Sequence, residues 1–515
     1  MVFSSIIFIC IFLPIMIIGY YVLPKKCRNI YLLLGSLFFY AWGEPKYIFL
    51  MLASIVGNYA FGMLIHHCAV KIEVDQSQED TPNPNVKSYI NYKKIALAVT
   101  IIFNIGLLIY FKYFVLLATT AKSLFNENII VPEIALPIGI SFFTFQGMSY
   151  VIDVYRQDYK LDKNGVRNDL VQKNPINLAL YISMFPQLIA GPIVRYGDIK
   201  AYLKERTTTS DQFVNGIERF IIGLSKKVIL ANSLGEVADK IFTANIDYVG
   251  TKVAWIGIVF YTIQIYFDFS GYSDMAIGLG KMFGFEFMEN FNYPYIAKSI
   301  SEHWRRWHIS LSTWFKDYVY IPLGGNRKGN VYVNLFIVFL ATGIWHGAAW
   351  GYLVWGIWHG IFTLLERFLK QKTKGMNIKG MNIKVPGIVG WAYTMMVIFI
   401  GFVVFKLEEI PKALSYLGVM FHVRPYDYVA FSPSYYLDGK VVFIFVVAVL
   451  ACLPWKEYFY RYVSNHKDGK VATMAATIPA EAVTIVKRVV LIIMFVLSFM
   501  FIVNSTYNPF IYFRF

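Results

Sequence analysis

Charged residues are scarce in this 515-residue chain, where Asp, Glu, Lys and Arg together make up 16%. An average soluble domain contains about a quarter of such residues. Hydrophobic residues account for 57% of the chain, and the mean hydropathy is +0.50. These values exclude a cytosolic enzyme, a disordered chain and a secreted disulfide scaffold, and they predict a polytopic membrane protein.

Cysteine and the common site motifs are also rare. The four cysteines form no CxxC pair, which predicts core or interfacial thiols and neither a metal site nor a disulfide framework. The sequence contains no P-loop, no dinucleotide-binding GxGxxG, no HExxH and no GxSxG at a strand–helix turn. No histidine pair at i, i+4 spacing accompanies a carboxylate ligand, so we expect no metal and no bound cofactor.

The charge that is present is mostly positive, with 48 Lys and Arg against 32 Asp and Glu, a net charge of +16. In a soluble protein this excess suggests nucleic acid. In a membrane protein, basic residues collect in cytoplasmic loops and face anionic lipid. We therefore expect anionic membrane lipids as partners, and no nucleic acid.

Long apolar runs recur along the chain, and each bilayer crossing needs about 20 apolar residues. The strong candidates are 2–23, 47–65, 95–117, 331–350, 352–365, 387–405, 441–453 and 489–503. Shorter or interrupted candidates are 30–40, 134–152, 176–193, 220–234 and 253–267. We expect roughly 11 to 13 embedded segments in one transmembrane domain covering residues 1–515, without a separate soluble domain.

Proline interrupts the apolar runs in the middle third, at Pro137, Pro186, Pro192 and Pro322. In a bilayer, broken backbone is tolerated only where it is buried in protein or lines a wet cavity. The sequence therefore predicts an all-α polytopic fold with re-entrant or broken helices around a central cavity.

Basic residues next to the first and last spans predict the orientation. The run 2–23 is too long for a cleavable signal, and the basic segment 25–28 follows it. Lys487 and Arg488 precede the last span. The positive-inside rule then places both termini outside the cytoplasm.

His346 interrupts an apolar run that is otherwise uncharged, in the string Gly343-Ile-Trp345-His346-Gly. An ionisable residue inside a membrane span is a functional candidate by default, although a neutral histidine bonded to a neighbouring helix explains it equally well. The flanking glycine favours close approach of a second backbone or a substrate. His359 repeats the Trp-His-Gly triplet nearer the basic end of the next span, where we expect a structural or entry role.

The polar stretch 302–327 predicts an interfacial amphipathic helix with its tryptophans at headgroup depth. Arg305 fits a membrane-surface anchor. His308 lies between the apolar and basic faces of this helix, from which it could reach inward.

Asp268 ends an apolar run and precedes a predicted Ser-Gly turn, with Ser270 or Ser273 as cap of the next helix. Asp268 could equally orient a histidine or receive a buried arginine. For Asp268 and Asp274 we expect capping or scaffolding ahead of catalysis.

Taken together, several strings resemble one family. They are residues 141–147, 185–192, 266–274 and 304–325, followed by Trp-His-Gly at 345–347. The combination resembles the membrane-bound O-acyltransferases, in the branch of the bacterial alginate O-acetyltransferases, near the peptidoglycan O-acetyltransferases and the teichoic-acid D-alanyl transfer proteins. The similarity covers nearly the whole chain, and the motifs are specific only in combination.

The resemblance implies a ring of transmembrane helices around a thinned centre, with a tunnel that joins the two membrane faces. Two histidines near its middle correspond to His346 and His308. By this resemblance His346 is the general base, and His308 orients it or donates to an oxyanion. Residues expected to support the tunnel or the substrate are Asp268, Gln187, Trp345 and Arg305.

The last residues, Asn508-Pro-Phe-Ile-Tyr512-Phe-Arg-Phe, fit an aromatic belt anchor. They also resemble the C-terminal motif of the single-span partner in the D-alanylation pathway, in which a tyrosine relays the acyl group. By that resemblance Tyr512 is an acyl relay.

The resemblance implies an O-acyltransferase of the bacterial cytoplasmic membrane. It would move an acetyl group from a cytoplasmic thioester donor, acetyl-CoA, to an extracytoplasmic polysaccharide through a partner acetyltransferase. One alternative is D-alanyl transfer to teichoic acid. Another is a non-enzymatic transporter of polysaccharide or lipid-linked sugars, which domain-scale repeats and paired acidic residues inside spans would favour; the sequence contains neither.

Overall fold

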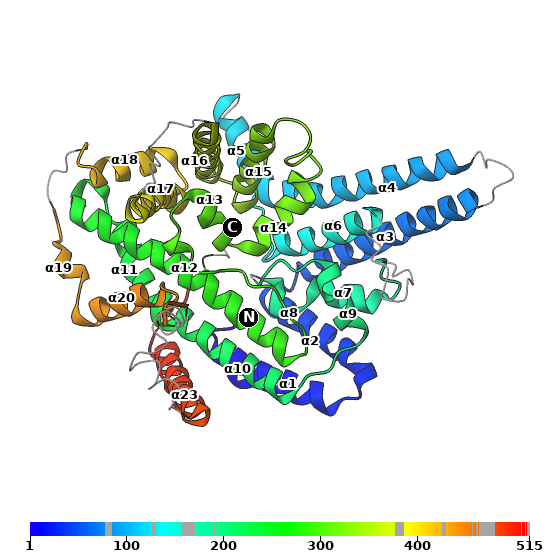
Figure 1. The fold of residues 1–515 in the computed structure, drawn as a ribbon, viewed down its shortest axis with the longest axis horizontal. Helices are drawn as coiled ribbons and strands as arrows, with labels where there is room; N and C mark the ends of the chain where they lie inside the picture. The colour runs from blue at the N-terminus through cyan, green and yellow to red at the C-terminus, as the bar shows by residue number, and fades with distance from the viewer. Residues whose placement is uncertain are drawn as a thin grey trace. The chain divides into compact units, whose positions relative to one another are not determined.

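The computed structural model describes residues 1–77, 85–125, 130–156, 170–189, 191–375, 386–424, 429–455, 457–459, 462, 479–505, 507–509 and 511. Every regular element in these residues is helical, as predicted (Figure 1). The chain divides into two compact units. The N-terminal unit comprises Met1–Ile217 and Ala276–Met288, and the C-terminal unit comprises Glu218–Met275 and Glu289–Phe515. The single domain over residues 1–515 stays a prediction.

The N-terminal unit is built around helices α3 and α4, which lie side by side (Figure 1). Their buried side chains Asn58 and Asn104 bond to each other in both directions, at 3.0 and 3.3 Å. Such an amide pair satisfies both polar groups between apolar helices. The helices of this unit are α1 (Leu13–Val22), α2 (Arg28–Gly43), α3 (Ile48–Ser77), α4 (Asn85–Leu108), α5 (Phe114–Leu124), α6 (Ile140–Arg156), α7 (Pro175–Ser183), α8 (Phe185–Leu188), α9 (Tyr196–Lys204) and the start of α10 (Ser210–Ser225).

The interruption predicted within 176–193 is present between α7 and α8. Met184 leaves the helical conformation there, with φ −55° and ψ 114°. Pro186 follows in the first turn of α8, where its missing N–H costs nothing. Gln187, which is fully buried in α8, donates through Nε2 to the carbonyl of Tyr181 at 2.5 Å. This hydrogen bond links α8 to α7 across the interruption.

The C-terminal unit holds the candidate histidines, and its core lies among α11, α12, α17 and α18. Helix α12 begins in this unit, and its last residues belong to the N-terminal unit. The helices are α11 (Asn232–Thr243), α12 (Thr251–Met282), α13 (Ile300–Arg306), α14 (Ile309–Phe315), α15 (Val331–His346), α16 (Trp350–Gly375), α17 (Gly387–Leu407), α18 (Ile410–Met420), α19 (Pro433–Tyr436), α20 (Gly439–Ala451) and α23 (Ala480–Asn504).

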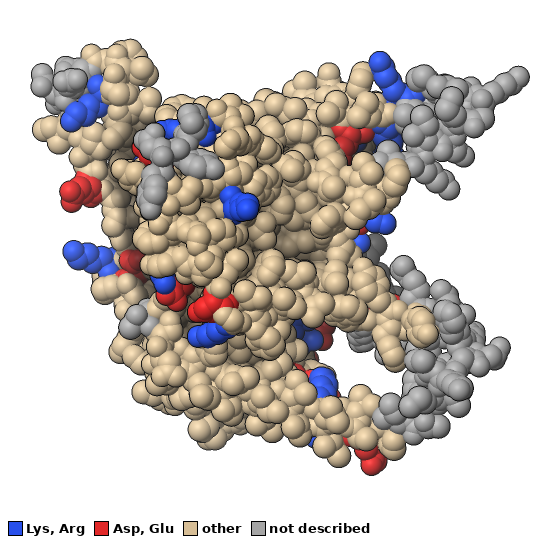
Figure 2. All heavy atoms as spheres, turned by 90° about the vertical axis from the view of Figure 1, so that its left-hand side faces the viewer, with Lys and Arg blue, Asp and Glu red and all other residues tan. Residues whose placement is uncertain are grey.

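The described helices confirm a multi-pass membrane protein. Five are long and apolar enough to cross a bilayer: Ile48–Glu73, Val86–Leu124, Thr251–Met282, Gly387–Leu407 and Glu481–Asn504. Shorter apolar helices are Phe8–Val22, Val331–His346 and Gly439–Ala451. Most of the face drawn in Figure 2 is uncharged, as a lipid-facing surface requires. The number of embedded segments and the side of the two termini stay predictions.

The turn expected after Asp268 is wrong, because α12 continues through it to Met282. Gly271 lies against the backbone of α10, where an added Cβ would stand 2.7 Å from the carbonyl oxygen of Gly223. At Gly223 an added Cβ would stand 2.5 Å from the carbonyl oxygen of Gly271. The glycine therefore permits close helix packing and does not form a turn.

Candidate functional site

His346 is the last residue of α15, and its ring is enclosed by aromatic side chains of the same unit. Only 4% of the residue is exposed. Its ring centroid lies 5.1 Å from that of Trp345, 4.9 Å from Trp355 and 5.3 Å from Phe405. Helix α15 therefore places the imidazole among rings from α15, α16 and α17, away from bulk water.

The close contact of α15 with α16 depends on glycine, as the sequence suggested. An added Cβ at Gly343 would meet the carbonyl oxygen of Tyr352 at 2.6 Å, and one at Gly356 would meet the carbonyl oxygen of Phe339 at 2.6 Å. At Gly347 it would meet the Tyr352 ring at 2.2 Å. These contacts fix where α15 ends, and hence where His346 lies.

His308 lies at a break in the polar stretch. The single amphipathic helix predicted over 302–327 is wrong, because α13 ends at Arg306 and α14 begins at Ile309. Between them His308 adopts a left-handed backbone, with φ 42°. Such a conformation is costly for a residue with a Cβ and is typically retained at functional sites. The break turns the His308 ring inward, where it is 1% exposed.

His308 and His346 both pack against Trp345. The His308 ring centroid lies 6.0 Å from that of Trp345 and 4.6 Å from that of Phe269. The structure thus brings together three of the predicted site residues. Their roles stay predictions.

His308 lies outside the candidate membrane spans. Burial lowers the pKa of His308 well below its ordinary value of 6.5, and the nearby His346 lowers it further. The ring is therefore neutral at pH 7, and a neutral imidazole can accept a proton.

Asp268 forms a buried ion pair, which corrects the expectation of a helix cap. Its Oδ1 lies 2.6 Å from Nζ of Lys227, and both side chains are 2% exposed. Lys227 belongs to a π-helical segment, Lys226–Ala231, between α10 and α11. Sequence reasoning missed this lysine, although an ionisable residue inside the apolar run 220–234 was the signal for it.

The same ion pair binds the main chain of the C-terminal tail. Lys227 donates to the carbonyl of Pro509, and the N–H of Ile511 donates to Oδ2 of Asp268 at 3.0 Å. Both ions thereby gain the additional hydrogen bonds that a buried pair needs. Ile511 itself is 9% exposed and belongs to the core of the C-terminal unit.

Further contacts hold the tail on both sides of Pro509. Tyr507 donates to Asp239 at 2.5 Å, and Asn232 donates to Asn508 at 3.2 Å.

A small cavity of about 20 Å³ lies beside the tail, with a volume close to what one water needs. It is lined by Ile511 and by Phe405, whose ring packs against that of His346. Tyr512 lies outside the described residues, and it directly follows Ile511.

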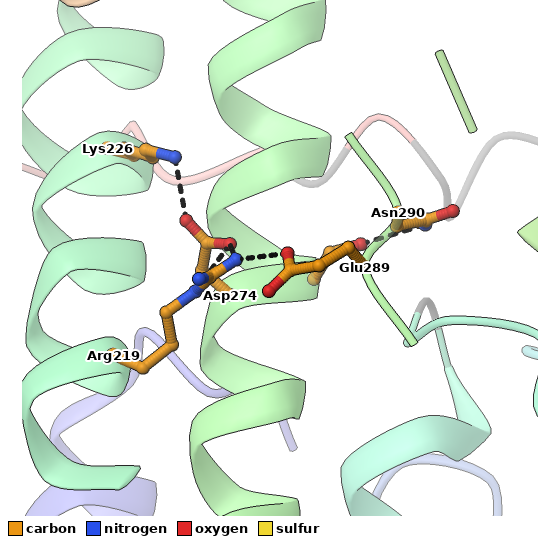
Figure 3. Close-up of polar contacts among 6 residues, drawn as sticks. Arg219, Lys226, Asp274, Glu289 and Asn290 are labelled. Carbon is orange, nitrogen blue, oxygen red and sulfur yellow. Dashed lines mark hydrogen bonds and ion pairs between the residues drawn. The ribbon is translucent and has the colours of Figure 1, made fainter. Parts of the chain in front are cut away.

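A charged network joins α10 to α12 and to the segment that follows α12 (Figure 3). Asp274 accepts from Arg219 at 2.7 and 3.0 Å and from Lys226 at 2.7 Å. Arg219 also reaches Glu289 at 2.5 Å. Asp274 lies inside α12, so it joins helices and caps none; scaffolding was one of its two predicted roles.

The remaining candidate residues do not belong to the cluster of His308, Trp345 and His346. Arg305 is exposed on α13, as an anchor would be. His359 is buried on α16 and packs against Trp355 and Trp304, at 5.1 and 5.2 Å between centroids. Gln187 belongs to the N-terminal unit. Among the described residues, no group of three His, Cys, Asp or Glu side chains could hold a metal ion.

Glu366 on α16 is a positioning residue that the sequence did not reveal. Its carboxylate accepts from the backbone N–H of Ile300 at 2.6 Å, and from the N–H and hydroxyl of Ser301 at 2.9 and 2.7 Å. A carboxylate at a helix N-terminus satisfies the open N–H groups and the helix dipole. Glu366 thus fastens α13, which leads to His308, onto α16.

Comparison with known proteins identifies the family of this chain. Residues 131–407 match the model of the MBOAT family, the membrane-bound O-acyltransferases. The chain is 37% identical to "Probable alginate O-acetylase AlgI" of Pseudomonas putida over 100% of both chains. It is 35% identical to the peptidoglycan O-acetyltransferase of Helicobacter pylori, over 82% of this chain and 80% of that one.

A more distant relative is the teichoic acid D-alanyltransferase of Bacillus subtilis, which is 29% identical over 46% of this chain and 60% of that one. The matched region of the family model, 131–407, includes both histidines of the cluster around Trp345. The chain therefore belongs to the membrane-bound O-acyltransferase family and is a multi-pass membrane O-acyltransferase.

Proposed function

We propose that this enzyme takes an acetyl group from a cytoplasmic thioester, acetyl-CoA, and passes it across the membrane for O-acetylation of an extracytoplasmic polysaccharide. One observation supports the chemistry above all others: two buried histidines of one unit share the ring of Trp345. The relatives support the acceptor class, because two are named for alginate and peptidoglycan.

His346 acts as the general base in this proposal. Its imidazole takes the proton of the acceptor hydroxyl as the oxygen bonds to the acyl carbon. The carbon–sulfur bond then breaks, and the thiolate leaves and takes up a proton. Such a base contributes on the order of 10²–10⁴ in rate. The enclosing rings of Trp355 and Phe405 exclude water that would otherwise hydrolyse the thioester.

Tyr512 is the first acceptor hydroxyl in this scheme. The tail is bound at Pro509 and Ile511 by the Lys227–Asp268 pair, which holds the chain immediately before Tyr512. The acyl group moves from sulfur to the phenolic oxygen, and then to a partner acetyltransferase outside the cytoplasm as the tyrosyl ester breaks. The bacterial cytoplasmic membrane, with its anionic lipids against the basic loops, is the proposed location.

The ester content of purified envelope polysaccharides tests this function. We expect cells that lack the protein to export their polymers without the O-acetyl esters that mild alkali releases, and the wild-type gene to restore them. Loss of esterified D-alanine with unchanged acetate would support D-alanyl transfer instead. Loss of the exported polymer, with normal acetylation of what remains, would support a transporter.

A further inference from the structure

Asn290 is a buried residue whose side-chain amide contacts His308, Ser310 and Ser273. The residue is 1% exposed. Its Oδ1 lies 3.2 Å from the backbone nitrogen of Ser310, 2.9 Å from the Ser310 hydroxyl and 3.1 Å from Nδ1 of His308. Its Nδ2 donates to the hydroxyl of Ser273 on α12 at 3.0 Å.

These contacts determine which nitrogen of His308 carries the proton. A backbone N–H can only donate, so the Asn290 atom that faces Ser310 is the oxygen. The Ser310 hydroxyl also lies 3.5 Å from Nδ1 of His308, but it donates its one hydrogen to the Asn290 oxygen, which is closer, at 2.9 Å. The Asn290 oxygen is an acceptor 3.1 Å from Nδ1, so the hydrogen between them is on Nδ1. In a neutral imidazole with Nδ1–H, the other nitrogen, Nε2, holds a lone pair.

Asn290 is held in place from both sides. Its carbonyl accepts from the N–H of Ile309, the residue after His308, at 2.9 Å. The preceding residue, Glu289, is bound by Arg219, which also binds Asp274 of α12 (Figure 3). The segment that carries Asn290 is thus bound at two consecutive residues, to α10 through Glu289 and to α12 through Asn290.

We propose that Asn290 is a positioning residue, which holds His308 in the tautomer with hydrogen on Nδ1 so that Nε2 serves as a proton acceptor. This inference rests on the proposed function and refines it. A neutral His308 held this way cannot donate from Nε2 to an oxyanion. Its Nε2 is instead a proton acceptor for His346, once His346 has taken the proton of the acceptor hydroxyl.

The tautomer can be measured directly by ¹⁵N NMR of the full-length protein with labelled histidine. The His308 signal is the one that disappears in His308→Gln. We expect its Nδ1 to show the shift of a protonated nitrogen and its Nε2 that of an unprotonated one. The reverse assignment in the wild-type protein would overturn the proposal, whether or not the enzyme is active in the sample.

Substitutions at Asn290 separate positioning from folding. Asn290→Asp keeps an acceptor oxygen for His308, and we expect Nδ1 to stay protonated. Asn290→Leu removes the acceptor; we expect a mixture of tautomers and a kcat about 10- to 100-fold lower, with KM within about twofold. Ser273→Ala removes only the partner of the amide nitrogen and serves as the control, with the wild-type tautomer.

Two results would contradict this role. One is an unchanged tautomer and kcat in a folded Asn290→Leu protein. The other applies if Asn290→Leu does not fold: it is an Asn290→Asp protein in which Nε2 of His308 is protonated and Nδ1 is not. A different result would contradict the proposed function. In that case His346→Gln would keep full activity, while the tautomer of His308 in the wild-type protein would still be the one assigned here.

Discussion

At the scale of single residues, buried ionisable groups mark the candidate site, and Lys227, Asp268 and His308 each have a polar partner there. Lys227 and Asp268 neutralise each other and bind the tail. His308 is held by Asn290. A charge that loses its partner inside a protein costs far more than a surface ion pair contributes.

Lys227→Met tests how much the buried Lys227–Asp268 ion pair contributes to stability. The substitution leaves the buried carboxyl of Asp268 without its cation, so we expect the free energy of unfolding to fall by about 3–5 kcal/mol. Lys240→Met is the matched control, because Lys240 forms an exposed pair with Glu236 on α11. For Lys240→Met we expect the free energy of unfolding to fall by only about 0.3–0.5 kcal/mol. Denaturant unfolding in detergent measures both; equal effects would contradict a structural role for the buried pair.

The sequence predicted His346, Trp345 and His308 as site residues, because an ionisable residue beside glycine stands out in an apolar run and because the surrounding motifs resemble a family. The structure brings the three together. It did not identify Asn290, Lys227 or Glu366. Their significance depends on long-range contacts: Glu366 meets residues 65 and 66 positions away, and Asp268 meets one 243 positions away. Nothing in local spacing encodes such pairs.

At the scale of elements, the predicted apolar runs lie in helices, but the positions at which helices end were not all predicted correctly. The interruption expected within 176–193 is present at Met184, and Pro186 lies in the first turn of the next helix, α8, where its missing N–H is not needed. The predicted turn at Gly271 is wrong, because this residue lies inside α12 and packs against α10. The stretch 302–327 reads as one amphipathic helix, but the contacts of the segment 290–292 with 306–309 hold His308 in a left-handed conformation that no propensity favours.

The C-terminal tail is the element whose function is most open to test. Tyr512→Phe keeps the ring and removes the hydroxyl that would accept the acyl group, so we expect polymer acetylation to fall to background while the protein level in the membrane stays normal. Tyr435→Phe, at an exposed ring that stacks on Phe431, is the control. O-acetyl analysis of the polymers measures both. Acetylation at the wild-type level in Tyr512→Phe would exclude the relay.

At the scale of the whole molecule, composition alone predicted a helical multi-pass membrane protein, which the structure and the family confirm. Orientation and the tunnel follow from charge bias and from the family resemblance, and they stay predictions. The proposed transfer across the membrane would depend on the whole chain, because in that proposal the donor and the acceptor lie on opposite sides and His346 serves both.

The most direct measurement is the rate at which membrane vesicles transfer labelled acetyl from acetyl-CoA to envelope polysaccharide. With His346→Gln, which keeps the size of the side chain and removes the base, we expect a rate about 10²–10⁴-fold below wild type. His67→Gln, on the exposed surface of α3, should retain the wild-type rate. Transfer by a folded His346→Gln protein within tenfold of wild type would contradict the account.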